Sequence, residues 1–309
     1  MSANTSPATR DLLPYAIMLG TALCFSTNII FGRFVAPDSH PFVLAFLRWA
    51  SVALILLPTV LAGQVHSTMA FIKNNVGLLI ILGILGMGVS GGGVYWGLQM
   101  TTATNATLIY SVAPALILML ERFFRGRPIS WREVLGAMIA FAGVAAIITQ
   151  GSLSTLRALE FNLGDILIAA ATLSWASYSI LLKTDRIKDI RPMALFCVIA
   201  FFGALANLPF AATSLVVGEG SPPSMAGWFA LAGIIVISSL MAFSGYQFGI
   251  RKLGPSLAGM FMFLMTPFGV ILAVIFLGEK LAAYQIVAIG AVMAGVATAT
   301  MPKSLRSTA

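Results

Sequence analysis

Ten long apolar segments dominate the sequence, and they limit its possible folds more than any other feature. Each is about 20 residues long, the length of helix that crosses a hydrocarbon core about 30 Å thick. Continuous apolar runs predict helices, whereas barrel strands alternate apolar and polar residues. The sequence therefore predicts an all-α polytopic membrane protein with ten transmembrane helices. The expected spans are residues 13–33, 42–62, 76–99, 104–123, 133–150, 163–182, 192–217, 226–250, 256–277 and 281–301.

The composition agrees with a membrane protein, because 59% of the residues are hydrophobic and only 9% are charged. Soluble domains carry about 25% charged residues. The net charge of +8 does not indicate a nucleic-acid partner, since the basic residues lie in short loops between apolar runs. Cys24 and Cys197 lie inside apolar runs, so we expect no disulfide, no metal site and no cofactor. The first apolar run is too long for a signal peptide and should remain a spanning helix.

The second half of the chain resembles the first half. The stretch Tyr246–Val296 repeats features of Tyr95–Val144 at an offset of about 152 residues. We therefore expect two five-helix repeats, residues 1–150 and 151–309. An odd number of helices in the first repeat makes the second enter the membrane from the opposite face, so the repeats are inverted. The matching pairs are Gly97-Leu98 with Gly249-Ile250, Gly126 with Gly278, and Gly143-Val144 with Gly295-Val296.

Positive charge is distributed unequally between the two sides of these ten spans. Fourteen of the 18 Lys and Arg residues lie on the side of the N-terminus, mainly in residues 122–132 and 183–191. The opposite side has Arg33, Arg157 and Lys280. Cytoplasmic loops carry the excess of Lys and Arg, so both termini are expected in the cytoplasm. The predicted location is the inner membrane of a bacterium.

Two motifs resemble those of the drug/metabolite transporter superfamily, in its EamA branch. Each half has a proline in its fourth helix, Pro114 and Pro267, and a turn before its fifth. The second turn, Gly278-Glu279-Lys280-Leu281, matches the family pattern, whereas the first departs from it with Gly126-Arg127-Pro128-Ile129. Within the superfamily the chain is most similar to the YddG-type exporters. That resemblance implies export of aromatic and other neutral amino acids. The inverted repeats themselves predict alternating access, because two such units can exchange conformations and open one central site to either side in turn.

No catalytic cluster is visible in the sequence, so an enzyme is not expected. His40 and His66 are the two histidines, and no Ser, His and Asp set could converge in the membrane. Proton-driven carriers commonly use a carboxylate or histidine within a span. We therefore expect either downhill efflux or coupling through a group that the sequence does not reveal. The acidic residues lie at or near helix ends: Asp11, Glu121, Glu133, Asp165 and Glu279.

Polar and aromatic residues gather on the helices predicted to face a central cavity. Rings would hold an apolar side chain, cation-π contact would hold an ammonium group, and amides would hold a carboxylate. The alternative for each residue is structural, as an interface anchor or an interhelical hydrogen bond. Mid-span positions favour a binding role for Asn28, Trp175 and Tyr178. The full set of candidate substrate-binding residues is Asn28, Tyr95, Trp96, Tyr110, Trp175, Tyr178, Ser244, Tyr246 and Gln247.

Arg48 is the one cation well inside a predicted span, roughly 10 Å along the helix from Pro41. The favoured interpretation is that it extends to the headgroups or bonds to a neighbour's carbonyls. The alternative is contact with an anionic group of the substrate. A single cation also argues against a sugar-phosphate or nucleotide-sugar carrier, which needs several donors.

Glycine and proline positions suggest where helices bend or pack closely. Gly88 and Gly92, in a glycine-rich third helix, serve close packing and are hinge candidates together with Pro114 and Pro267. Small residues also repeat at four-residue spacing in the fifth and tenth helices, at Gly136 with Ala140 and Ala291 with Gly295. They suit contacts within the bundle or between two copies, so both a monomer and a homodimer remain open.

The sequence thus predicts an exporter of small organic solutes, most of all amino acids, with a small-molecule substrate and the lipid bilayer as its partners. Three alternatives remain. The chain could export other metabolites or drugs, it could be a receptor or scaffold that transports nothing, or it could be a membrane enzyme. An inverted repeat around a polar cavity disfavours the second, and the missing reactive cluster disfavours the third.

Overall fold

The computed structural model describes residues 7–35, 39–61, 65–218 and 223–301. Within these ranges ten helices are long and apolar enough to cross a membrane, which confirms the predicted fold class. Six spans are single helices: α1 (Pro7–Val35), α2 (Pro41–Leu61), α7 (Trp131–Ile148), α9 (Leu163–Leu181), α10 (Pro192–Val216) and α15 (Ala283–Thr300). Short helices α8 (Leu153–Arg157) and η3 (Asp185–Ile187) lie in connections.

The other four spans are irregular: three change helix type along their length, and the fourth span is two α-helices separated by a turn. The third consists of α3 (Val65–Gly83), the π-helix η2 (Ile84–Gly93) and α4 (Val94–Leu98), and the fourth of α5 (Ala103–Tyr110) and α6 (Ala113–Arg125). The eighth consists of α11 (Met225–Gly233), the π-helix η4 (Ile234–Met241) and α12 (Ala242–Leu253). The ninth consists of α13 (Pro255–Met260), the 3₁₀-helix η5 (Phe261–Leu264) and α14 (Met265–Leu277).

The third span begins earlier than the sequence predicted. Its helix starts at Val65, and the segment long and apolar enough to cross a membrane starts at Thr68 rather than near residue 76. The polar residues Lys73, Asn74 and Asn75 interrupt the apolar run, but they do not interrupt the helix. Helical hydrogen bonding therefore continues past the point where hydropathy falls.

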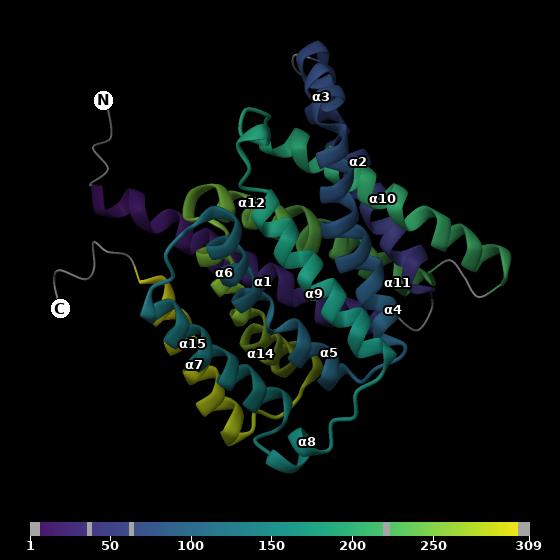
Figure 1. Ribbon diagram of the computed structural model, residues 1–309. Coiled ribbons are helices and arrows are strands. Elements are labelled where there is room, and N and C mark those ends of the chain that lie inside the picture. The colour runs from purple at the N-terminus through teal and green to yellow at the C-terminus, as the bar shows by residue number, and fades with distance from the viewer. Residues whose placement is uncertain (1–6, 36–38, 62–64, 219–222, 302–309) are drawn as a thin grey trace.

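Helices from the two halves of the chain pack in pairs. Helix α7 packs along α15 at one edge of the molecule, and α2 packs along α10 at another (Figure 1). A Cβ added at Gly136 would lie 2.5 Å from the Gly295 carbonyl oxygen, so the α7 and α15 backbones are in direct contact. The predicted small-residue surfaces therefore face each other within one chain.

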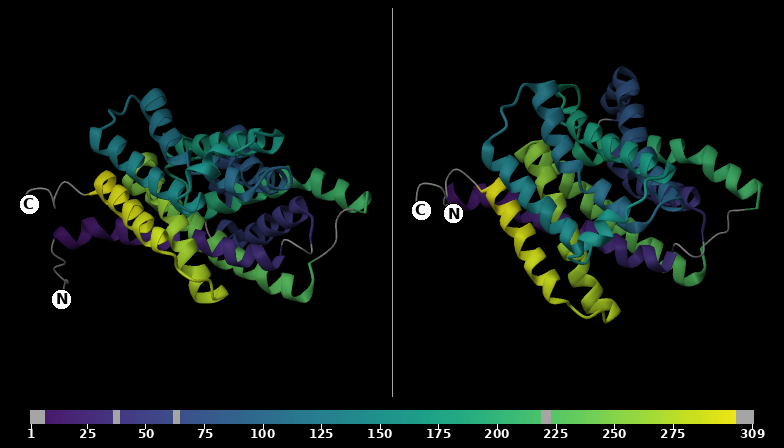
Figure 2. Two further views of the ribbon diagram at one scale, coloured as in Figure 1. Left: turned by 90° about the horizontal axis from the view of Figure 1, so that it is seen from below. Right: turned by 60° about the horizontal axis from the view of Figure 1, so that its bottom comes forward.

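The central helices α1 and α9 have equivalent surroundings. Helix α1 packs against the eighth and ninth spans, whereas α9 packs against the third and fourth. The beginning of α1 and the end of α15 lie on the same side of the molecule (Figure 2). We call that side, with connections 126–130 and 182–191 and with Gly254, the termini face. The distal face carries connections 99–102, 149–162 and 278–282.

The two π-helices, one in each half of the chain, contain the same kind of serine hydrogen bond. In η2 the Ser90 hydroxyl donates to the Leu85 carbonyl, 2.7 Å away and five residues back. In η4 the Ser239 hydroxyl donates to the Ile234 carbonyl at 2.9 Å, again five residues back. Such π-helical turns are rare and occur frequently at functional sites. Both segments lie near the middle of their spans, at the level of the cavities described next.

Candidate functional site

Two adjoining cavities lie between the central helices. The outer cavity has a volume of about 430 Å³ and the inner one about 160 Å³. Leu98, Ala106, Ala273 and Glu279, which lie at or near the distal ends of their spans, line the outer cavity. The outer cavity therefore extends toward the distal face. Five residues line both cavities and join them: Val94, Tyr110, Trp175, Met262 and Met265.

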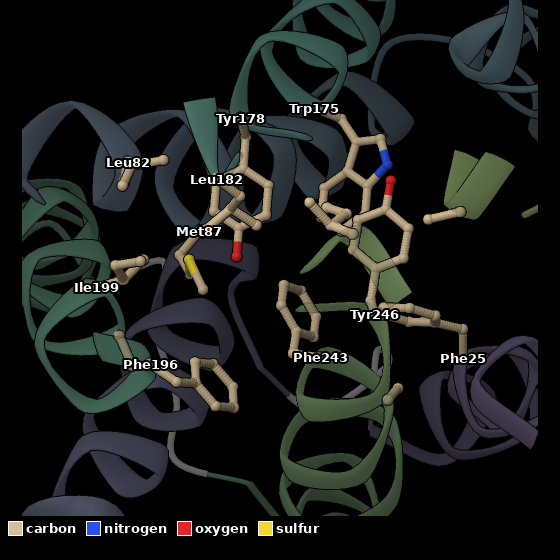
Figure 3. Packing of buried hydrophobic residues seen from close by; sticks show 14 of the residues in the cluster. Phe25, Leu82, Met87, Trp175, Tyr178, Leu182, Phe196, Ile199, Phe243 and Tyr246 are labelled. Atoms are coloured by element: carbon tan, nitrogen blue, oxygen red, sulfur yellow. The ribbon is translucent and has the colours of Figure 1, made fainter. Parts of the chain in front are cut away.

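A layer of aromatic residues lies beside the inner cavity, and Figure 3 shows four of its members, Phe25, Trp175, Phe243 and Tyr246, packed together. The Trp175 ring stacks on Tyr246 with 5.1 Å between centroids, and Phe25 meets the edge of Trp175 at 6.1 Å. Phe243 contacts Phe25 at 5.2 Å. Trp175 is 3% exposed and Tyr246 is fully buried, so these rings are closely packed.

Polar contacts hold the helices together nearer the termini face. The Tyr246 and Ser179 hydroxyl oxygens are 2.9 Å apart and share a hydrogen bond. The Glu121 carboxylate accepts hydrogen bonds from the Ser256 amide at 3.1 Å and from the Ser256 hydroxyl, which joins the end of α6 to the first turn of α13. Nearby, the Lys183 ammonium donates to the Arg251 carbonyl at 2.7 Å. The structure is thus closed at the termini face.

The structure brings some of the predicted binding residues together and separates others. Asn28, Tyr95, Tyr110 and Trp175 line the inner cavity, which joins residues of the first, third, fourth and sixth spans. Beneath Trp175, three candidates are buried in the closed layer: Tyr178, Tyr246 and Gln247. These three line neither cavity. The same holds for Trp96, which is 39% exposed, and for Ser244, which donates to the Met193 sulfur at 3.7 Å.

Arg48 also lines the inner cavity and is only 6% exposed. Its Nε donates to the Ser239 hydroxyl at 2.7 Å, and its Nη2 donates to the Ser238 carbonyl at 3.2 Å. Nη1 lies 3.3 Å from the Tyr95 hydroxyl. The sequence favoured two structural roles for Arg48. The prediction that its side chain extends to the lipid headgroups is wrong, because the side chain is buried. The prediction that it bonds to a neighbouring helix is confirmed by its hydrogen bonds to η4.

The proposed hinge residues lie next to irregular helix segments. Gly88 and Gly92 belong to η2, where a Cβ at Gly92 would clash with the Asn207 side chain. Pro114 follows the break between α5 and α6, and Pro267 follows the 3₁₀-helix η5. These positions fit bending as well as close packing, and the hinge role stays a prediction.

Several cavity residues were not predicted from the sequence. Met262 and Met265 line both cavities, and Phe25 and Phe243 line the inner one. Apolar residues in a membrane helix carry no signal that separates cavity from lipid. No group of three or more metal-ligating side chains occurs in the part of the chain that the structure describes.

Comparisons with known proteins agree with this arrangement. Residues 12–149 and, separately, 162–301 match the EamA-like transporter family. The uncharacterized transporter YyaM of Bacillus subtilis is 26% identical over 94% of both chains. The uncharacterized inner membrane transporter YedA of Escherichia coli K12 is 24% identical, with 96% of this chain and 94% of that protein aligned.

Two further similarities concern another relative and a solved structure. A protein named S-adenosylmethionine uptake transporter, from Rickettsia bellii, is 24% identical over 65% of this chain and 67% of its own. A solved crystal structure superposes with a TM-score of 0.76 at 20% identity, covering 93% of this chain and 97% of the other. At that identity the likeness establishes the fold alone.

Proposed function

Since the chain belongs to the EamA-like transporter family, and is a membrane transporter rather than an enzyme, we propose that it exports small organic solutes, most of all aromatic and other apolar amino acids. The observation that carries this proposal is the pair of adjoining cavities between the central helices. Methionines and aromatic rings line them, with a few polar groups at the inner end. Such a lining suits an apolar body joined to a small polar head.

The mechanism that we propose is alternating access between two inverted repeats. The separate family matches to residues 12–149 and 162–301 support two equivalent units. The packing of α1 and α9 against equivalent partners supports the same division, as do the corresponding serine bonds in η2 and η4. Two such units can exchange conformations and open one central site to either side in turn.

The proposed location is a bacterial inner membrane, with both termini in the cytoplasm. The excess of Lys and Arg at the termini face supports this orientation. The name of the E. coli relative, an inner membrane transporter, supports the location. In this orientation the outer cavity leads to the periplasm, and the aromatic layer with the Glu121–Ser256 contact closes the cytoplasmic side.

The energy source that we propose is the substrate gradient itself. No carboxylate of the described residues lines the inner cavity, and Glu279 lines the outer one. Collapsing the proton gradient in vesicles, with the substrate gradient held fixed, should leave the rate of efflux nearly unchanged. A large loss of efflux would contradict the downhill mechanism.

The direct test is transport by the purified protein in proteoliposomes, measured in both directions. The panel contains the amino acids together with S-adenosylmethionine, because one relative carries that name. We expect efflux of phenylalanine, tryptophan, leucine and methionine, and strong loss in Trp175→Ala because the ring between the two cavities is removed. Transport of S-adenosylmethionine or drugs without any amino acid would overturn the substrate class. Absence of transport for every compound would favour a receptor or scaffold.

A further inference from the structure

Arg48 is buried within the helix bundle, well inside the second span. It is 6% exposed, and no described carboxylate lies within ion-pair distance of its guanidinium group. The guanidinium carbon lies 4.7 Å from the Trp49 ring centroid and 5.9 Å from that of Phe243, so aromatic faces shield the charge. Burying a charge without an opposite charge is unfavourable, and charged residues at such depth usually mark functional sites.

The hydrogen bonds of Arg48 leave part of the guanidinium available. This group has five N–H donors. Three are directed at Ser239, Ser238 and Tyr95, through Nε, Nη2 and Nη1 respectively. One N–H on each terminal nitrogen has no acceptor among the described residues. Two adjacent N–H groups are what a carboxylate binds through two parallel hydrogen bonds.

The cavity next to Arg48 contains a second group without a partner. The Asn28 side-chain oxygen is buried and accepts no hydrogen bond from any described residue. Asn28 and Arg48 line the inner cavity together with Trp175 and Tyr110. An amide oxygen and aromatic faces suit an ammonium group. The inner cavity therefore combines a carboxylate donor pair with an ammonium acceptor.

We propose that Arg48 binds the carboxylate of the transported molecule, and that the Asn28 oxygen accepts a hydrogen bond from its ammonium group. The apolar side chain then extends through the shared lining into the outer cavity. This inference rests on the proposed function, because it assigns a pose to the substrate in the same transport site. It makes a free carboxylate a requirement for binding. The second half contributes the supports, Ser238 and Ser239 in η4, that hold the guanidinium in place.

Three related probes separate these interactions. L-phenylalanine has both charged groups, phenylalanine amide lacks the carboxylate, and 3-phenylpropanoate lacks the ammonium. Binding is measured as the rise in melting temperature of the purified full chain in detergent, titrated with each probe, so that no transport is needed. The wild-type protein should bind phenylalanine about tenfold or more tightly than the amide, because the amide leaves the guanidinium without an anionic partner.

Substitutions of Arg48 and Asn28 then test which residue causes the preference for phenylalanine over each of the other two probes. In Arg48→Gln the affinity for phenylalanine should fall about tenfold or more, and the preference for acid over amide should disappear. Arg48→Lys should retain part of the preference for acid over amide, because an ammonium group keeps the positive charge but cannot form the bidentate pair of hydrogen bonds. Asn28→Leu should lose the preference for phenylalanine over 3-phenylpropanoate. Arg132→Gln, which removes an exposed Arg charge outside both cavities, is the matched control and should keep both preferences.

The outcomes distinguish this inference from the proposed function. A folded Arg48→Gln protein that still prefers acid over amide would overturn it, and so would a wild-type protein that binds the amide equally well. The comparison of phenylalanine with its amide uses the wild-type protein alone, so it tests the inference even if Arg48→Gln does not fold. If no amino acid is transported but 3-phenylpropanoate binding depends on Arg48, the proposed function fails and the carboxylate site stands.

Discussion

The two faces of the helix bundle close in different ways. At the termini face, Glu121 at the end of the fourth span binds Ser256 at the start of the ninth. The repeat offset of about 152 residues places Ala273 in the position that corresponds to Glu121, and Ala273 lines the open outer cavity. An alanine cannot supply the equivalent hydrogen bonds. Within the proposed repeat, the Glu121–Ser256 contact therefore has no counterpart at the distal face, and we expect it to stabilise the state that is closed at the termini face.

The strongest test of this comparison fixes the closed face covalently. In a Cys24→Ala, Cys197→Ala background, Glu121→Cys and Ser256→Cys would be bridged by a short, reducible, bifunctional thiol reagent. Turnover in proteoliposomes should fall to background, because this joint must open in every cycle, and a reducing agent should restore it. Each single cysteine treated with the same reagent is the control. Undiminished transport by fully bridged protein would show that the joint stays closed during transport.

Removing the Glu121 carboxylate should weaken the closed face without blocking it. Hydrogen bonds to a charged group contribute about 1.5–3 kcal/mol each, so Glu121→Ala should shift the equilibrium toward opening at the termini face about tenfold or more. The measurement is the rate at which a hydrophilic maleimide labels Ser179→Cys from that face. Ser256→Ala keeps its backbone amide bond to Glu121 and should show a smaller increase. If Ser179→Cys were labelled equally fast with and without Glu121→Ala, Glu121 would not stabilise the closed termini face.

The paired prolines test whether both halves bend at corresponding places. Pro114→Ala and Pro267→Ala each allow a straighter helix beside the breaks in the fourth and ninth spans. Turnover should fall several-fold in each variant, whereas the melting temperature should remain close to that of the wild type. If both variants kept full turnover, the hinge hypothesis would be abandoned, and if one did, bending would be confined to the other half.

The smallest effect should come from the hydroxyl pair under the aromatic layer. Tyr246→Phe keeps the ring stacked on Trp175 but removes the hydrogen bond with Ser179. A single neutral hydrogen bond contributes about 1 kcal/mol net, so turnover should change about fivefold or less. The control Ser177→Ala removes only a bond from an exposed hydroxyl to the Leu173 carbonyl of its own helix. A complete loss of transport in Tyr246→Phe would give that hydroxyl a direct role in substrate binding.

Hydropathy was sufficient to predict the ten spans, because crossing a bilayer requires long apolar helices whatever their partners are. It failed at the start of the third span, where Lys73, Asn74 and Asn75 lower the hydropathy but the helix continues. The π-helices were also not foreseen. A widened turn depends on how neighbouring helices pack, and the serine bonds within η2 and η4 resemble ordinary serine contacts in a sequence.

The candidate site was only partly predictable for a related reason. Asn28, Tyr110 and Trp175 were identified because polar and aromatic residues in the middle of a span are conspicuous. Met262 and Met265 resemble lipid-facing residues until the ninth span is placed beside the fourth. Arg48 shows the limit most clearly. Its position in the span was evident from the sequence, but its contact with Ser238 and Ser239, nearly 200 residues away, exists only in the packed bundle.

The central claim is that one cavity opens to the two faces in turn. Its most direct measurement compares Ser111→Cys, in the outer cavity, with Ser179→Cys, beneath the aromatic layer, in the cysteine-free background. Both are labelled with a membrane-impermeant maleimide during steady transport and without substrate. Alternating access predicts that Ser111→Cys is labelled from the distal face at rest. Transported substrate should slow this labelling and should speed labelling of Ser179→Cys from the termini face. Substrate-independent labelling at both positions, or an increase at both together, would contradict it.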